Sequence, residues 1–328
     1  MDFQRANRDA NGDTNLEASK EARTGVVVPA ARGQILLPLC FLMFFLFCAG
    51  CVRDFPQSNA NEVYLLDLLD TTPVRKGTSP ADLSSVGLWF RADSISAADG
   101  TPLSSWPDSS PNSFHAANGT AAEQPLFRTA FLNGRPVVSF DGVNDFLVSS
   151  DVEYQTVTYI AVVQFTKAWN PGWGTFGHRM NILAQNDDFP NASTALYFNW
   201  AEVSGAGQAT ISLRTKIDDG TPMFYVGTGN VQQNEWYILS ATFDGQYATL
   251  YRNGALQSST GPYPGNVYNS NTPFYLGRHG ASTAGTHRFG GEMAEVLLFT
   301  EALSAQDREG VECYLSIKYG LSVIQSCL

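Results

Sequence analysis

The sequence predicts an all-β protein built as a sandwich of two antiparallel sheets, and three observations support this prediction. The chain of 328 residues holds 29 Gly and 16 Pro, 12% of its residues are aromatic, and only 16% are charged. This composition suits short strands joined by turns better than it suits a bundle of helices. Short apolar runs alternate with turn residues from residue 86 onward, which is the pattern of a two-sheet jelly roll. A single short helix is predicted close to the C-terminus.

The most informative stretch is 133–148. β-branched and aromatic residues dominate 137–140, Asp, Asn and Gly dominate 141–145, and apolar residues resume at 146–148. Two apolar strands separated by such a turn predict either a β-hairpin or a corner between two sheets.

Further strands are predicted wherever an apolar run of similar length lies between turn signals. These runs are 86–93, 156–165, 180–184, 195–200, 209–215, 223–226, 235–243, 247–252, 274–276 and 293–299. The run 156–165 is apolar on both faces, so we expect it in the middle of a sheet. Asp244-Gly245 and Asn253-Gly254 predict two tight hairpins.

The predicted helix begins after Ser304, a suitable N-cap with Asp307 three residues further on. Val311 and Leu315 lie on one face of that helix, and Gly320 stands where a C-terminal glycine is expected. The helix is therefore expected to pack one apolar face against the sandwich.

The charge balance excludes one class of ligand. The chain has a formal net charge of −11, and residues 79–328 hold 12 Lys or Arg against 22 Asp or Glu. Nucleic acids are bound through clusters of Lys and Arg. We therefore expect no nucleic-acid partner.

The N-terminal region predicts export from the cytoplasm. Residues 1–34 are polar, and 35–50 are almost purely apolar. Sixteen apolar residues are short for a bilayer span but suit the core of a signal peptide. We therefore divide the chain into a polar leader with signal peptide (1–50), a tether (51–85) and one β-sandwich domain (86–328).

The apolar segment closes with Cys48-Ala49-Gly50-Cys51, which resembles the lipobox of bacterial lipoproteins. The resemblance implies cleavage before Cys51 and its lipidation, although Cys48 stands where Leu is usual. An uncleaved signal anchor is the alternative. Both interpretations export the domain, and Val52 in place of Asp favours an outer-membrane or cell-surface lipoprotein, with a periplasmic orientation left open.

Two cysteines remain in the predicted domain, Cys313 and Cys327. An even pair in an exported domain predicts a disulfide bond, and two free thiols are the alternative.

Several motifs in a fixed order resemble the concanavalin A-like (laminin-G-like) lectin and glucanase superfamily. They occupy 87–93, 106–110, 115–117, 133–147, 236–254, 275–278, 291–304 and 314–320. The resemblance implies a jelly-roll sandwich that often binds glycans or proteins, with calcium in some members. It also implies that three scaffold tryptophans are buried, namely Trp89, Trp106 and Trp236.

The predicted ligand-binding residues are Trp169, Trp173, Phe176, His178 and Trp200. The first four lie on a long connection between two predicted strands, where loops of a rigid scaffold often bind ligands. Aromatic faces can stack on the C–H surfaces of sugars. The alternative is that these rings cover the hydrophobic core.

Two candidate metal sites follow from the sequence. Asp141, Asn144 and Asp145 offer hard oxygen ligands for calcium within one turn, and the alternative is that they only shape the turn. His279 and His287 share one Gly-rich loop, but they lack an obvious third ligand, so we expect them to be solvated rather than bound to metal.

Catalysis on this fold would need two carboxylates that face one sugar. The nearest pair is Glu292 and Glu295, and residues three apart on a strand point to opposite faces. The predicted function is therefore non-catalytic binding of a carbohydrate or protein ligand by a membrane-anchored lipoprotein. A polysaccharide hydrolase or lyase, or a structural envelope protein, are the alternatives.

Overall fold

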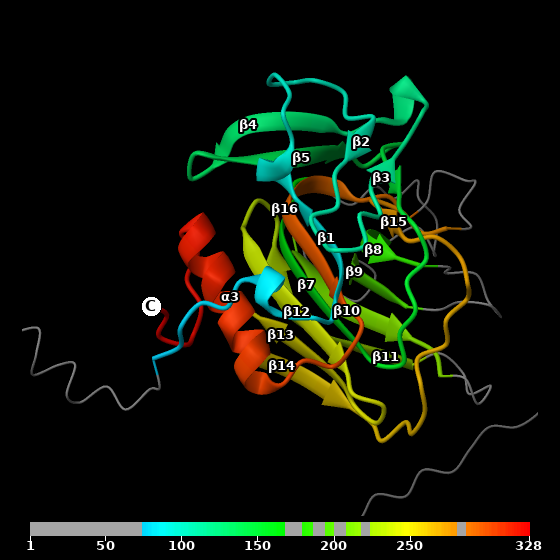
Figure 1. Ribbon diagram of the computed structural model, residues 1–328, viewed down its shortest axis with the longest axis vertical. Helices are drawn as coiled ribbons and strands as arrows, with labels where there is room; N and C mark the ends of the chain where they lie inside the picture. Colours follow the sequence, from blue (N-terminus) through cyan, green and yellow to red (C-terminus); the bar gives the residue numbers. More distant parts are fainter. Residues whose placement is uncertain (1–73, 168–178, 186–193, 200–207, 218–223, 281–286) are drawn as a thin grey trace, which may run out of the picture. The chain divides into compact units, whose positions relative to one another are not determined.

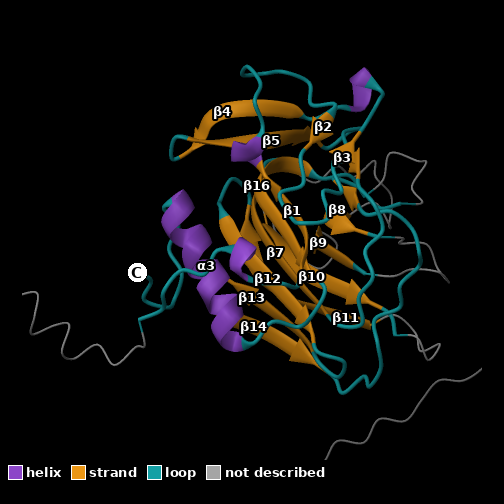
Figure 2. Ribbon diagram, viewed as in Figure 1, coloured by secondary structure: helices purple, strands orange, loops and turns teal. Residues whose placement is uncertain are grey.

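The computed structural model describes residues 74–167, 179–185, 194–199, 208–217, 224–280 and 287–328. These residues form two antiparallel sheets of eight strands each, with one α-helix packed on the first sheet (Figures 1 and 2). This arrangement confirms the predicted fold class. Three short 3-10 helices precede or interrupt the strands: η1 (Pro80–Asp82), η2 (Ala92–Ser94) and η3 (Ala121–Glu123).

The first sheet is organised around its two longest buried strands, β7 (Val157–Phe165) and β16 (Gly290–Phe299). Every residue of both strands is buried, which confirms the predicted central position of 156–165. β16 also pairs with β1 (Val86–Arg91). The other strands, in spatial order, are β14 (Ala255–Thr260), β13 (Ala248–Arg252) and β12 (Tyr237–Phe243) beside β7, and β5 (Arg135–Asp141) and β4 (Leu126–Leu132) beside β16.

The second sheet contains the strands that carry the candidate site. Its order is β11 (Phe224–Gln232), β10 (Gln208–Thr215), β9 (Ala195–Asn199), β8 (Arg179–Ala184), β15 (Tyr275–Leu276), β6 (Leu147–Val148), β3 (Ala116–Ala117) and β2 (Ser105–Trp106). The sequence did not predict β4 or β14, and β11 is longer than the predicted run 223–226.

Two apolar clusters stabilise the molecule. The larger cluster fills the space between the sheets and includes Phe90, Phe140 and Leu213. The second lies between the outer face of the first sheet and the helix. Of the predicted scaffold tryptophans, Trp89 and Trp106 are buried, whereas Trp236 is only partly buried.

The stretch 133–148 is a corner between the sheets, since β5 belongs to the first sheet and β6 to the second. The tight hairpin predicted at Asn253-Gly254 is present, and both residues have positive φ. The connection at Asp244-Gly245 is longer than the expected two residues, because Asp244 Oδ1 accepts hydrogen bonds from the backbone N–H groups of Gln246 and Tyr247.

The helix α3 (Ala305–Tyr319) has the predicted ends. Ser304 Oγ accepts a hydrogen bond from Asp307 N, and Gly320 ends the helix with φ 64°. Tyr319 lies in the apolar cluster against the first sheet. Within the part of the chain that the structure describes, no helix has the length and apolar content that a membrane span requires.

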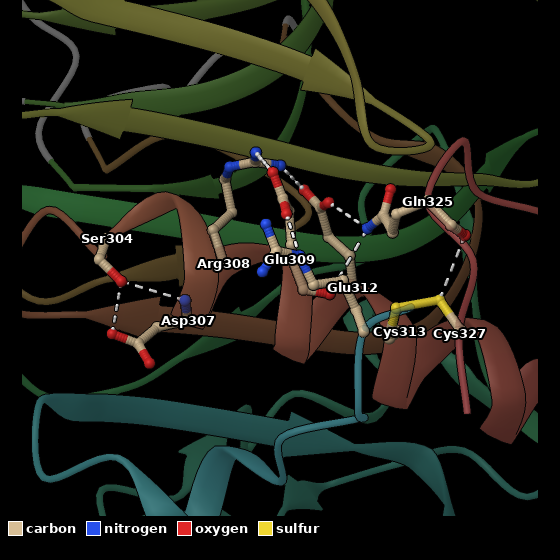
Figure 3. Close-up of polar contacts among 9 residues, drawn as sticks. Ser304, Asp307, Arg308, Glu309, Glu312, Cys313, Gln325 and Cys327 are labelled. Atoms are coloured by element: carbon tan, nitrogen blue, oxygen red, sulfur yellow. Dashed lines mark hydrogen bonds and ion pairs between the residues drawn. A yellow bond between two sulfur atoms is a disulfide. The ribbon is translucent and has the colours of Figure 1, made fainter. Parts of the chain in front are cut away.

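The chain before η1 is joined to the C-terminal tail and to α3. Arg75 N donates to Ser326 O (2.6 Å), Leu328 N donates to Arg75 O (2.9 Å), and Thr78 N donates to Gly310 O (2.8 Å). The tail is attached to α3 by the predicted disulfide between Cys313 and Cys327 (Figure 3).

Candidate ligand-binding face

The outer face of the second sheet is polar. On β10, Ile211 and Leu213 point into the core between the sheets, so the alternating residues Ser212 and Arg214 point to the opposite side. The same alternation turns polar side chains of β8, β9 and β10 outward: Arg179, Asn181, Tyr197, Thr210, Ser212 and Arg214. Asn181 is opposite Tyr197, and Tyr197 is opposite Ser212, so one polar row crosses three strands.

These polar side chains are shielded from water. The exposed fraction is 0% for Asn181, 2% for Tyr197 and 1% for Arg214. The guanidinium of Arg179 lies 5.5 Å from the centre of the Tyr197 ring. This face therefore offers directional hydrogen-bonding groups beside a small apolar cluster of Ala184, Ala195 and Tyr197.

Two histidines adjoin this row. His279 Nε2 and His287 Nδ1 are 2.7 Å apart, and Asn181 Nδ2 donates to His287 O at 3.3 Å. His279 is only 4% exposed, so the expectation of two solvated histidines is wrong for His279. Burial, with the charges of His287 and of Arg214, lowers the pKa of His279 to about 3. His279 is therefore neutral at physiological pH.

The two ends of the loop that carries these histidines are held together. Gly277 N donates to Ile182 O (3.3 Å), and Phe289 N donates to Gly277 O (2.8 Å). Gly277 has φ 84°, and a Cβ there would lie 2.6 Å from the Phe140 ring, so this position requires glycine. The next residue on one side is Arg278, and the preceding residue on the other is Arg288.

Both arginines lie near the ring of Phe146. The Arg278 Cζ atom is 3.6 Å from the ring centre and that of Arg288 is 5.4 Å away. Arg278 is also 4.9 Å from the ring centre of Tyr275. Sequence reasoning did not select these arginines, because an arginine beside a glycine-rich turn is usually solvated. The one feature of the sequence that could have indicated them is that two arginines flank a single loop in an acidic chain.

The predicted calcium ligands shape their own turn. Asp141 Oδ1 accepts hydrogen bonds from the backbone N–H groups of Val143, Asn144 and Asp145, and Asp145 Oδ2 accepts one from Asp141 N. Burial raises the pKa of Asp145 to about 6. Over the described residues, no group of three or more His, Cys, Asp or Glu side chains is arranged to hold a metal. Calcium binding at this turn stays a prediction.

The predicted aromatic ligand residues lie outside the described residues, as does the lipidation site Cys51. They are Trp169, Trp173, Phe176, His178 and Trp200. In the chain, however, 168–178 leads directly into Arg179, the first residue of β8, and Trp200 directly follows the last residue of β9. The predicted residues are therefore continuous with the two strands that carry Asn181 and Tyr197.

The orientation predicted for Glu292 and Glu295 is wrong. The pairing of β16 with β7 shifts between Met293 and Glu295, which marks a β-bulge at Ala294. Met293 points into the core between the sheets, whereas Ala294 packs on the helix side. The extra residue brings both carboxylates to the outer face of the first sheet, where Ser139 Oγ donates to Glu292 Oε1 at 3.1 Å.

Glu295 is nevertheless enclosed beneath α3. Its exposed fraction is 0%, and its oxygens accept hydrogen bonds from Trp89 Nε1 (2.5 Å), Lys318 Nζ (2.7 Å) and Tyr319 OH (2.8 Å). A carboxylate held by three donors under a helix is not presented to a substrate. Its role is to join the sheet to the helix.

Comparison with known protein families identifies the fold of the larger part of the sandwich. Residues 155–307 match the family model described as the concanavalin A-like lectin/glucanases superfamily. The fold of this region is concanavalin A-like. The match runs from the start of β7 to the beginning of α3 and includes all of β8, β9 and β10. No curated protein matches the sequence.

Two solved structures are weakly similar to this chain. The binding domain of Paraclostridial Mosquitocidal Protein 1 shares 14% identity with a TM-score of 0.48, covering 70% of this chain and 52% of that one. Domain 4 of AbnA, a GH43 extracellular arabinanase from Geobacillus stearothermophilus in complex with arabinotriose, shares 16% identity with a TM-score of 0.46. That match covers 70% of this chain and 97% of the other. The chain thus spans about half of the first structure and nearly all of the second.

Proposed function

We propose that the concanavalin A-like region is a non-catalytic binding module for a carbohydrate, and that the ligand binds at the outer face of the second sheet. The observation that carries this proposal is the polar row of Asn181, Tyr197 and Ser212, which crosses three strands at registered positions. An amide, a phenol and a hydroxyl in one row can each donate and accept hydrogen bonds, as sugar hydroxyls do. Binding sites typically combine such convergent polar groups with aromatic side chains.

The aromatic part of the proposed site comes from the chain segments next to the row. Trp169, Trp173, Phe176 and His178 precede β8, and Trp200 follows β9. Indole and phenyl faces would stack on the sugar ring while the row binds its hydroxyls. A protein ligand on the cell surface is the competing class.

We further propose that the domain acts outside the cytoplasm, attached to the outer membrane or cell surface by lipid on Cys51. The disulfide between Cys313 and Cys327 supports export, because such bonds persist in oxidising compartments. Mass spectrometry of the mature N-terminus tests the anchor. We expect a diacylglyceryl-modified Cys51 and loss of membrane association in Cys51→Ser. A mature chain that retains residues before Cys51 would contradict this proposal.

The binding proposal is tested by glycan-array measurements on the full chain, purified in mild detergent, with calcium and with a chelator. We expect specific binding that falls at least about tenfold in Tyr197→Phe, which removes one hydroxyl, and in Trp169→Ala or Trp173→Ala. Tyr247→Phe, on the exposed β12–β13 connection, is the matched control. A loss of binding in the chelator would place calcium at the site.

Two results would contradict the proposal. Full affinity in Tyr197→Phe would exclude the polar row, and a blank array in both conditions would favour a protein partner. Turnover of a polysaccharide that disappears in Glu292→Gln would favour the enzymatic alternative instead.

A further inference from the structure

Arg278 and Arg288 form a pair of cations at the base of the loop between β15 and β16. The hydrogen bond from Phe289 N to Gly277 O holds the two ends of this loop together, so the two arginines leave it at neighbouring points. Phe146 provides an aromatic surface for both guanidinium groups. Stacking on a ring leaves the N–H edge of a guanidinium available for hydrogen bonds in its own plane.

Several of those N–H groups have no partner. Arg288 is 8% exposed, and its buried Nε and Nη1 atoms have no hydrogen-bond acceptor; the buried Nε of Arg278 has none either. No carboxylate of the described residues forms an ion pair with Arg278 or Arg288. The nearby carboxylates of Asp141 and Asp145 accept backbone N–H groups of their own turn.

Burying two neighbouring guanidinium groups costs free energy unless an anion binds to them. Burying a charge without a partner is unfavourable, and each guanidinium here also repels the other. Burial and the charge of Arg278 lower the pKa of Arg288, and the nearby carboxylates of Glu123, Asp141 and Asp145 offset part of that shift without hydrogen-bonding to it. Elsewhere in this chain a buried arginine is matched, since Arg308 lies 2.6 Å from the buried carboxylate of Glu312. Neighbouring carboxylates offset part of the charge of Arg288, but the buried N–H groups of the pair have no acceptor, and these donors point to a ligand.

We propose that Arg278 and Arg288 bind an anionic group of the ligand, so that the recognised carbohydrate is acidic, carrying a carboxylate or a sulfate ester. This inference rests on the proposed function and specifies its ligand class. Planar guanidinium groups bind such oxyanions through paired N–H donors, which favours arginine over lysine at the site.

The pair is structurally continuous with the polar row. Asn181 of the row donates to His287 O, next to Arg288, and the loop base is bonded to β8 through Gly277 N and Ile182 O. Several arginines gather around this loop, although the chain as a whole carries −11. The charges of three arginines all lower the pKa of His279: Arg214, Arg179 and Arg278. A sugar held by the row can thus place its acidic substituent at the pair.

The test compares matched acidic and neutral oligosaccharides by calorimetry on the full chain at low and moderate salt. Oligogalacturonate and its methyl ester isolate the carboxylate, and carrageenan and desulfated carrageenan oligosaccharides isolate the sulfate. We expect at least about tenfold tighter binding to the acidic member of one pair, reduced to within about twofold in Arg288→Gln and in the less buried Arg278→Gln. Whichever pair shows the preference identifies the anion.

Arg252→Gln is the matched control, since Arg252 lies 6.0 Å from the Tyr237 ring on the first sheet. An acidic preference that survives in both Arg278→Gln and Arg288→Gln would overturn the inference. Equal binding to acidic and neutral members would overturn it while leaving the proposed function intact. Binding to no oligosaccharide at all, in these pairs or on the array, would overturn both.

Discussion

The outer face of the first sheet and the loop between β15 and β16 bury charge in opposite ways. Where α3 packs on the first sheet, Glu295 of β16 and Glu312 of α3 are fully buried, and each is matched by a cation and further donors: Lys318 for Glu295, Arg308 for Glu312. Figure 3 shows Arg308 and Gln325 directed at Glu312 from the helix and the tail. In the loop between β15 and β16, Arg288 is buried with two unpartnered nitrogens.

This difference separates structural charge from ligand-binding charge. A buried ion pair with complete hydrogen bonding is satisfied within the chain, and its loss should cost stability. A buried cation whose N–H groups have no acceptor adds nothing to stability, because its burial is unfavourable, and it should instead determine affinity. The following predictions test that distinction, in decreasing order of their expected effect on the free energy of unfolding.

The largest effect is expected from Lys318→Met. This change leaves Glu295 buried without its cation, and we expect the free energy of unfolding to fall by about 3–5 kcal/mol at pH 7. Burial raises the pKa of Glu295 and Lys318 opposes that rise, so the variant should recover part of the loss at low pH, where the carboxylate binds a proton. Urea denaturation across pH measures this.

Lys167→Met, at an exposed lysine, is the matched control for this experiment. If the free energy of unfolding falls by less than about 1 kcal/mol in Lys318→Met, the ion pair between Glu295 and Lys318 does not stabilise the contact between the first sheet and α3.

Removal of the disulfide should have the next largest effect. Cys313 and Cys327 are 14 residues apart, and closing a loop of this length stabilises a protein by about 3 kcal/mol. We expect Cys313→Ser/Cys327→Ser and the reduced wild-type protein to show the same lower melting temperature. Unequal melting temperatures would mean that the serines perturb the buried site at Cys313.

A smaller change, an increase in the free energy of unfolding, is expected from Asp145→Asn. The pKa of Asp145 is raised to about 6 by burial, so the folded state holds its proton more tightly than the unfolded state. Stability from this group is therefore present below about pH 4 and is lost as pH rises to about 6. Asparagine should raise the free energy of unfolding by roughly 1–2 kcal/mol at pH 7–8, allowing for solvent screening. Equal stability of variant and wild type at pH 8 would exclude this account.

The smallest effect is expected from Arg288→Gln. The burial of this guanidinium is unfavourable and the nearby carboxylates of Asp141 and Asp145 offset that cost, so we expect its replacement to change the free energy of unfolding by less than about 1 kcal/mol, in contrast to Lys318→Met. Thermal denaturation of the two variants side by side gives the comparison. A loss of several kcal/mol in Arg288→Gln would assign this arginine a structural role.

The sequence predicted the features of the fold that depend on local signals. The corner at 133–148, the caps of α3 and the disulfide follow from turn residues, capping residues and cysteine count. The bulge at Ala294 could not be predicted, because a bulge depends on how β16 pairs with β7 and β5. The predicted orientation of Glu292 and Glu295 was wrong for that reason.

The candidate site was predictable only as a region. A long aromatic connection before β8 was visible in the sequence, and the strands beside it do carry the polar row. The burial of His279 and the pairing of Arg278 with Arg288 were not visible, because both arise from loop ends brought together by a backbone hydrogen bond.

The connection between Arg75 and the C-terminal tail has a mechanical consequence. Tension applied to the chain before Val74 enters the domain where Arg75 forms a parallel β-bridge with Cys327. Because Cys327 is covalently bound to α3, that tension passes into the helix and the first sheet. Strands β8, β9 and β10 belong to the other sheet and lie outside this path. A domain pulled from its N-terminal side can therefore bear load without distorting the proposed ligand-binding face.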